Sequence, residues 1–154
     1  MSKYREQRDR VQRWFEKFRL LDSGRPHNQP SDNYVDEVYA FFMNCYHLKD
    51  WIKNDPSAAA KVSKDVVEAY INETTALRLC ADVCNSLKHL ENSGRSGVNP
   101  EFGRKQYGLA IGGAANPTIS LKYEVKTDSG PIDAFQLASD CLTAWDSFFS
   151  THGL

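Results

Sequence analysis

Residues 31–54 read SDNYVDEVYAFFMNCYHLKDWIKN, a stretch without glycine or proline in which apolar side chains recur every three or four positions. This spacing is typical of an amphipathic helix. Ser31 or Asp32 can cap its first turn by accepting a backbone N–H. The stretch therefore predicts a helix over 32–54, with a core-facing arc made of Val35, Val38, Phe41, Phe42, Cys45 and Ile52.

The segments on either side extend the helical pattern. Pro56 follows Asp55 and favours a helix start, because proline at the first helical position lacks an N–H that would have no partner there. Asp133 followed by Gln136 forms a capping-box pattern at the start of a last helix. Helices are predicted over residues 3–20, 32–54, 56–71, 75–90 and 134–150.

Residues 118–126 (TISLKYEVK) change the period, since polar and apolar side chains alternate one by one. Strict alternation predicts a strand, and residues 106–113 can pair with it to give a hairpin over about 106–126. An isolated hairpin is marginally stable, so its apolar side is expected to lie on the helices. The predicted fold class is mainly α, a bundle of about five helices with a β-hairpin inserted before the last helix.

Size and composition indicate one domain, 1–154, because the chain has 154 residues, 41% of them apolar and 25% charged. No apolar stretch approaches the roughly 20 residues that cross a bilayer, and the first ten residues are too charged for a secretory signal. We therefore expect a cytoplasmic protein with no membrane partner. Its four cysteines lie in apolar segments, which favours reduced, buried thiols over disulfides.

A net charge of −1 hides a basic N-terminal segment. Residues 1–20 carry seven Lys or Arg against three acids, an excess of four positive charges. Arg8 and Arg13 are the candidates there for contacts with a phosphate backbone. Alternatively, this basic face covers the acidic remainder of the chain, which the low overall charge favours.

The helix predicted over 75–90 carries a polar stripe along one side. Its members lie at i, i+4, i+7 and i+11 and share a narrow sector of the helix. The stripe is either a solvated face or a surface that lines a groove or meets another subunit. It consists of Arg78, Asp82, Asn85 and His89.

The helix predicted over 32–54 offers a second polar pair. His47 and Asp50 are one turn apart and are a candidate acid–base pair, because an imidazole titrates near pH 6.5. Two surface side chains are the alternative. Lys49 lies within the apolar arc, either with its ammonium reaching the edge of the core or as a partly buried cation that binds an anion.

Residues 84–89, Cys-Asn-Ser-Leu-Lys-His, resemble the signature of the HEPN superfamily, which is Arg, a polar residue often Asn, a few variable positions and His. The resemblance implies a small helical bundle that forms a homodimer, in which two copies of the motif meet to bind or cleave RNA without a metal ion. It also implies a toxin–antitoxin or phage-defence setting. Asn85 and His89 match the motif, whereas Cys84 stands at the arginine position.

Cleavage of RNA requires proton transfer and positive charge on the phosphate. His89 is the candidate acid or base, Asn85 the orienting group, and Lys88 the source of charge, with Arg78 and Arg95 as alternative cations. Without the motif arginine, the expected function is RNA binding or degenerate ribonuclease activity. The alternative is a non-catalytic interaction module whose helical face and hairpin edge bind a protein partner.

A metal site is not predicted. Cys80 and Cys84 are one turn apart and, with His47 or His89, offer soft ligands. Their spacing differs from the short-loop pairs typical of structural zinc. No metal and no other cofactor is therefore expected.

Overall fold

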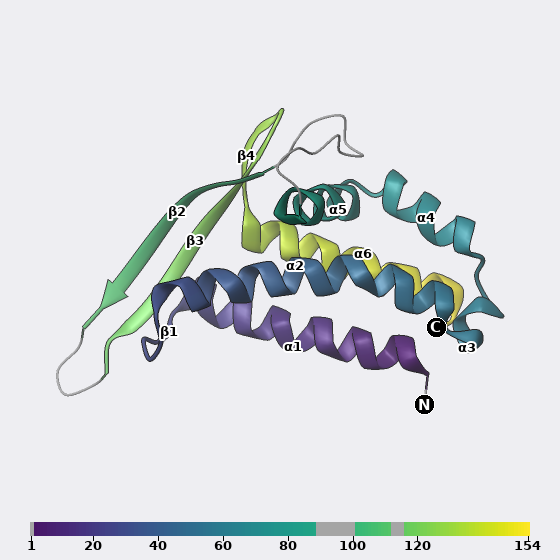
Figure 1. The fold of residues 1–154 in the computed structure, drawn as a ribbon, viewed down its shortest axis with the longest axis horizontal. Coiled ribbons are helices and arrows are strands. Elements are labelled where there is room, and N and C mark those ends of the chain that lie inside the picture. The colour runs from purple at the N-terminus through teal and green to yellow at the C-terminus, as the bar shows by residue number, and fades with distance from the viewer. Residues whose placement is uncertain (1, 89–100, 112–115) are drawn as a thin grey trace.

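The computed structural model describes residues 2–88, 101–111 and 116–154. Over these ranges the chain is mainly α, with six helices and a small antiparallel sheet placed before the last helix, which confirms the predicted fold class (Figure 1). The elements are α1 (Lys3–Ser23), β1 (Arg25–Pro26), α2 (Ser31–Asn54), α3 (Pro56–Ala59), α4 (Lys64–Glu73), α5 (Thr75–Lys88), β2 (Glu101–Ala110), β3 (Thr118–Thr127), β4 (Gly130–Asp133) and α6 (Ala134–His152).

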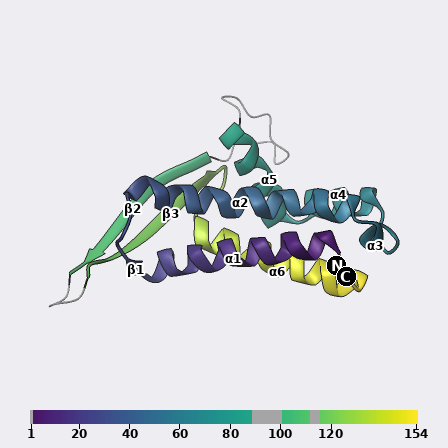
Figure 2. The same cartoon turned by 60° about the horizontal axis from the view of Figure 1, so that its bottom comes forward.

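Three long helices form the body of the fold. α1, α2 and α6 run side by side, and α5 packs against α2 and α6 (Figures 1 and 2). All six arc residues predicted for α2 are buried. Burial of one such phenylalanine contributes about 1.5–3 kcal/mol, and the rings of Phe41 and Phe42 lie edge to face with centroids 5.2 Å apart. Among the described helices, none is both long and apolar enough to cross a membrane.

The single helix predicted over 56–71 is wrong, because two shorter helices occupy this region. Asp55 caps α3 by accepting from the backbone N–H groups of Ser57 and Ala58, as the Asp55–Pro56 start indicates. Ser63 then caps α4 by accepting from the N–H of Val66 at 3.3 Å. A serine that can bond its own backbone competes with helix continuation, so the chain turns at residues 60–63 and starts a new helix.

The sheet is built around β3. β2 pairs with one edge of β3, while β1 and β4 pair with opposite ends of the other edge, all antiparallel. The predicted alternation is confirmed, since Ile119, Leu121, Tyr123 and Val125 are all buried. The paired strand begins at Glu101 rather than near residue 106, and β1 and β4 were not predicted.

The hairpin projects beyond the helices. α1 and α6 pack against β3, whereas β2 is the outermost strand and extends past the end of the bundle away from the chain termini (Figure 1). At the base of the sheet, α6 starts where predicted, with the Asp133 side chain accepting from the Gln136 N–H at 3.0 Å. The bundle is therefore well covered, and the far end of β2 is not.

Candidate functional site

The polar stripe on α5 is not a uniformly solvated face. Asp82 is 0% exposed and interacts with a neighbouring group. Arg78 is partly buried, and its Nη1 donates to the backbone carbonyl of Asn72 at 3.2 Å. Asn85 is half-buried near the C-terminal end of the helix. The stripe thus combines a buried carboxylate with a partly accessible amide.

The structure describes only part of the HEPN-like motif. Cys84, at the arginine position, is 0% exposed and packs in the core. Lys88 is the last described residue of α5, and His89 and Arg95 lie outside the described residues. Asn85 is therefore the motif residue whose side chain the structure places at a partly open position.

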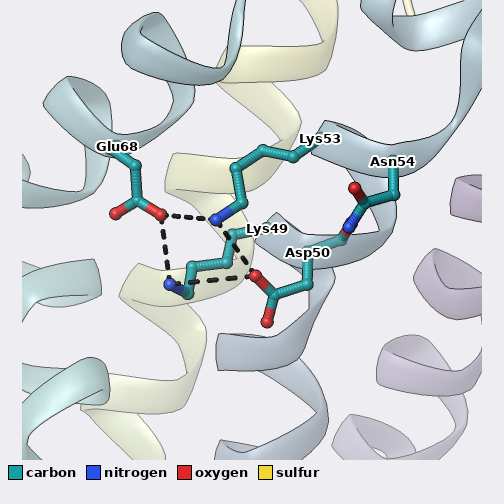
Figure 3. Close-up of polar contacts among 5 residues, drawn as sticks. All are labelled: Lys49, Asp50, Lys53, Asn54 and Glu68. Carbon is teal, nitrogen blue, oxygen red and sulfur yellow. Dashed lines mark hydrogen bonds and ion pairs between the residues drawn. The ribbon is translucent and has the colours of Figure 1, made fainter.

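An ion-pair network joins α2 to α4 (Figure 3). Lys49 Nζ lies 3.1 Å from Glu68 Oε1, and Lys53 Nζ lies 2.6 Å from the same oxygen. Asp50 Oδ1 completes the network at 3.0 Å from Lys53 and 3.9 Å from Lys49. The Lys49 ammonium also lies 4.7 Å from the centre of the Tyr46 ring. Two lysines and two carboxylates thus form a neutral cluster.

The network accounts for the lysine in the apolar arc of α2. The side chain of Lys49 is 10% exposed, and its ammonium is bound by a carboxylate of the same chain. Burial raises the pKa of Glu68, but hydrogen bonds from Lys53 and Lys49 outweigh burial and lower that pKa to about 2. Glu68 therefore takes the position that an external anion would need.

The predicted acid–base pair on α2 is partly committed to this network. Asp50 uses its Oδ1 in the ion pairs with Lys53 and Lys49. His47 is half-buried, with its ring centroid 5.9 Å from that of Tyr46. The carboxylate of the pair thus has a structural role between two helices.

The basic side chains of α1 are largely engaged within the chain. Arg8 Nη2 lies 2.8 Å from Asp146 Oδ1, and its guanidinium lies 4.4 Å from the centre of the Phe149 ring. Arg13 is exposed and forms no ion pair with any residue in the described ranges. This surface has less free positive charge than its composition suggests. The other arginine pairs along α1 are Arg10–Glu6 and Arg19–Glu16.

The far end of β2 combines an open edge with exposed apolar side chains. On β2, Tyr107 is 41% exposed and Leu109 60%, and Ile111, which directly follows the last residue of the strand, is 75% exposed. In the register of the hairpin, Tyr107 opposes Leu121 and Leu109 opposes Ile119, so these side chains share the helix-facing side of the sheet. Within the described ranges, β3 is the one strand that pairs with β2.

The four cysteines meet in the core. All four are free and buried, which confirms the prediction of reduced thiols. The Sγ atoms of Cys45, Cys80 and Cys141 lie within 4.8 Å of one another, and they come from α2, α5 and α6. In the described part of the chain, these residues form the one cysteine, histidine or carboxylate cluster that can hold a metal ion.

Sequence reasoning proposed the hairpin edge as a partner surface but did not name the apolar residues on it, and it missed the thiol cluster. A signal existed for each. Tyr107, Leu109 and Ile111 alternate with the same period as the predicted strand over 118–126. The cysteines occupy apolar faces of three helices, and such faces converge in the core of a bundle.

Comparisons with known proteins offer no relative for this chain. No protein family matches it, and no curated protein and no solved structure does so either. The arguments for its function therefore rest on its own side chains.

Proposed function

We propose that the protein is a non-catalytic interaction module that forms a homodimer by pairing the open edge of β2 with β2 of a second copy. The observation that carries this proposal is the exposure of Tyr107, Leu109 and Ile111 beside a strand edge that no described strand pairs with. Long, exposed apolar edge strands are templates for pairing with another chain. Strand addition supplies backbone hydrogen bonds, and the alternate side chains determine the register.

A second copy fits this edge because the edge complements itself. In an antiparallel pair with a two-fold axis at Gly108, each Tyr107 opposes Leu109 of the other copy, and each Ile111 opposes Lys105. The apolar stripes then cover each other on one side of a continuous sheet. The basic residues Arg104 and Lys105 are placed at opposite ends of the pair, so like charges stay apart.

The oligomeric state tests the proposal. We expect the wild-type chain to be a dimer in sedimentation and light-scattering measurements at micromolar concentration. A double substitution, Leu109→Arg with Ile111→Arg, is expected to give a folded monomer, because both side chains are exposed and charge repulsion would oppose pairing.

A matched control uses exposed apolar residues elsewhere. Leu20 and Val66 are 40% and 42% exposed on α1 and α4, and their replacement by arginine should leave the dimer intact. A monomeric wild type, or a dimer that survives the β2 substitutions, would refute the proposal. Pairing of a monomeric wild type with a different chain would assign the edge to a foreign strand instead.

RNA binding or metal-independent RNA cleavage is a second candidate function. It is supported by the partly buried amide of Asn85 beside the wholly buried carboxylate of Asp82, since a stripe of this kind differs from an ordinary solvated face. The proposed groups are Asn85, Lys88 and His89. If the protein acts on RNA, Asn85→Ala and His89→Ala should each reduce cleavage or binding while circular dichroism is unchanged.

Salt dependence separates the two functions. Contacts with phosphates weaken steeply as salt rises, since each contact releases counterions. Association through apolar side chains does not weaken in this way. RNA cleavage that persists unchanged in His89→Ala would exclude the proposed catalytic group.

A further inference from the structure

We propose that Cys45, Cys80 and Cys141 form a binding site for one thiophilic metal ion, Zn²⁺ or Cu⁺, in the core of the bundle. Their Sγ atoms lie within 4.8 Å of one another and come from three different helices. Thiolate sulfur is the protein ligand that selects these ions. The inference is independent of the β2 surface and of the RNA motif.

The distances suit a metal after a small contraction. Zn–S bonds of about 2.3 Å in a tetrahedral site separate neighbouring sulfurs by about 3.8 Å. The three Sγ atoms would therefore have to approach one another by no more than about 1 Å, which is within the reach of side-chain rotation.

Cys84 is a further buried thiol in the same part of the core, outside the group of three whose Sγ atoms all lie within 4.8 Å of one another. Cys84 is 0% exposed and lies one turn after Cys80 on the same side of α5. Its thiol is close enough to Cys80 and Cys141 to interact with both. Because structural zinc is almost always four-coordinate, Cys84 can complete the shell.

Trp145 offers a hydrogen-bond donor that suits a thiolate. The indole Nε1–H of Trp145 is buried and has no hydrogen-bond partner among the described residues. It lies close enough to the Cys45 thiol to interact with it. A thiolate bound to a metal would give this N–H an acceptor, as outer ligands commonly do in metal sites.

The other two thiols have weak partners that a metal can displace. Cys80 Sγ donates to the Phe42 carbonyl at 3.5 Å, and Cys141 Sγ donates to the Ala76 carbonyl at 3.4 Å. On binding, each of the three thiols loses its proton to the solvent and forms one S–metal bond, with no change in oxidation state. Zn²⁺ with three thiolates leaves one net negative charge in the core and Cu⁺ leaves two, and a Cys84 thiolate would add one more in either case, so burial favours zinc.

Metal titration of the full-length protein tests the site. Metal-free, reduced chain is titrated separately with Zn²⁺, with Cu⁺ under anaerobic conditions, and with Cd²⁺ as a spectroscopic probe. We expect one ion per chain, release of protons, a higher Tm and the ultraviolet charge-transfer absorption of Cd²⁺–thiolate bonds. The first two titrations identify which ion the site prefers.

Matched variants separate ligation from packing. Cys141→Ala is expected to weaken binding by more than about 100-fold, beyond the 10–100-fold typical of losing a group that hydrogen-bonds to a metal ligand. Val83→Ala removes a comparable buried group from α5 outside the cluster and should retain one ion per chain. Trp145→Phe keeps a buried ring without the N–H, and we expect about 10–100-fold weaker binding.

The wild-type titration decides the proposal even if an alanine variant fails to fold. Absence of one-equivalent binding for all three ions, including after refolding in their presence, would overturn the site. A folded Cys141→Ala variant that binds as tightly as the wild type would do the same.

Discussion

β2 and β3 have the same alternating pattern but different surroundings. On β3, Ile119 and Leu121 are 3% and 0% exposed, whereas their partners Leu109 and Tyr107 on β2 are 60% and 41% exposed. These four side chains lie on the same side of the sheet, and α1 and α6 pack against β3. Periodicity therefore specifies which side of a strand is apolar, whereas the position of the helices determines whether that side is buried.

The largest expected difference is in stability. Leu121→Ala should lower the free energy of unfolding by about 2–5 kcal/mol, because it removes a fully buried side chain and leaves a cavity. Leu109→Ala should change it by no more than about 0.5 kcal/mol, as is usual for surface positions. Denaturant unfolding at low protein concentration, where a second copy dissociates, measures both.

Equal effects of the two leucine substitutions would contradict the difference in burial between β2 and β3. A large effect of Leu109→Ala that appears only at high protein concentration would instead support it, because the lost stability would then come from the dimer. The concentration dependence of the unfolding midpoint distinguishes these outcomes.

The sequence predicted best those elements that pack against another layer of the fold. The predicted buried arc of α2 and the predicted buried side of β3 are both correct, because the period of apolar residues matches burial where two layers face each other. The break between α3 and α4 depends on one local competition at Ser63, and the two-residue strand β1 has too few positions to show a period. The first is a local choice between a cap and a continued helix, which periodicity does not resolve, and the second depends on the tertiary pairing of β1 with β3.

The candidate sites were less predictable, because each combines residues that are distant along the chain. Cys45 and Cys141 belong to helices that meet only after the bundle has formed, so ligand spacing within one helix gave no signal. Lys49 was recognised as unusual, yet its partner Glu68 lies on another helix. Asp82 was placed on a polar stripe, and the packing around α5 buries it.

Acid is expected to lower the stability of the fold through the helical bundle rather than through the hairpin. The pKa of Glu68 is about 2 in the fold, compared with an ordinary value of 4.5. The lowered pKa gives stabilisation that is complete above about pH 4.5 and is lost as pH falls towards 2. Glu68→Gln should cost about 1–2 kcal/mol at pH 7, less than the full shift implies, since solvent partly screens the network.

Acid unfolding curves of wild type and variant provide the measurement. Glu68→Gln should flatten the decline in stability between pH 4.5 and 2. Glu73→Gln is the matched control, since Glu73 is exposed on the same helix. An unchanged acid limb in Glu68→Gln would show that the network with Lys49 and Lys53 contributes no stability.

High pH is expected to lower the stability of the fold through the hairpin. Tyr123 on β3 is 4% exposed, and its hydroxyl lies 2.8 Å from that of Tyr39. Burial, followed by the hydrogen bond with Tyr39, raises the pKa of Tyr123 above its ordinary value of 10. A raised pKa gives stability that is complete below about pH 10 and decreases above it.

Tyr123→Phe tests this alkaline limb. The variant should lose about 1 kcal/mol at neutral pH, since Tyr39 loses its partner, and its stability should fall less above pH 10. Tyr107→Phe on the exposed strand is the matched control and should leave both quantities unchanged. If both variants keep the wild-type alkaline profile, the buried hydroxyl pair is not the cause of the decline.

The smallest expected effect on stability comes from an ion pair on the bundle surface, whose two side chains are largely open to solvent. The side chains of Arg8 and Asp146 are 43% and 65% exposed. Asp146→Asn should therefore change stability by less than about 1 kcal/mol, and high salt should abolish the difference.

The guanidinium of Arg8, freed from Asp146, would then be available to a phosphate. If the second candidate function is correct and α1 contacts RNA, Asp146→Asn should tighten RNA binding and steepen its salt dependence, whereas Arg8→Ala should do the opposite. Unaltered RNA affinity in both variants would exclude Arg8 from an RNA surface, because a phosphate contact at Arg8 cannot be indifferent both to loss of the cation and to loss of its competing carboxylate.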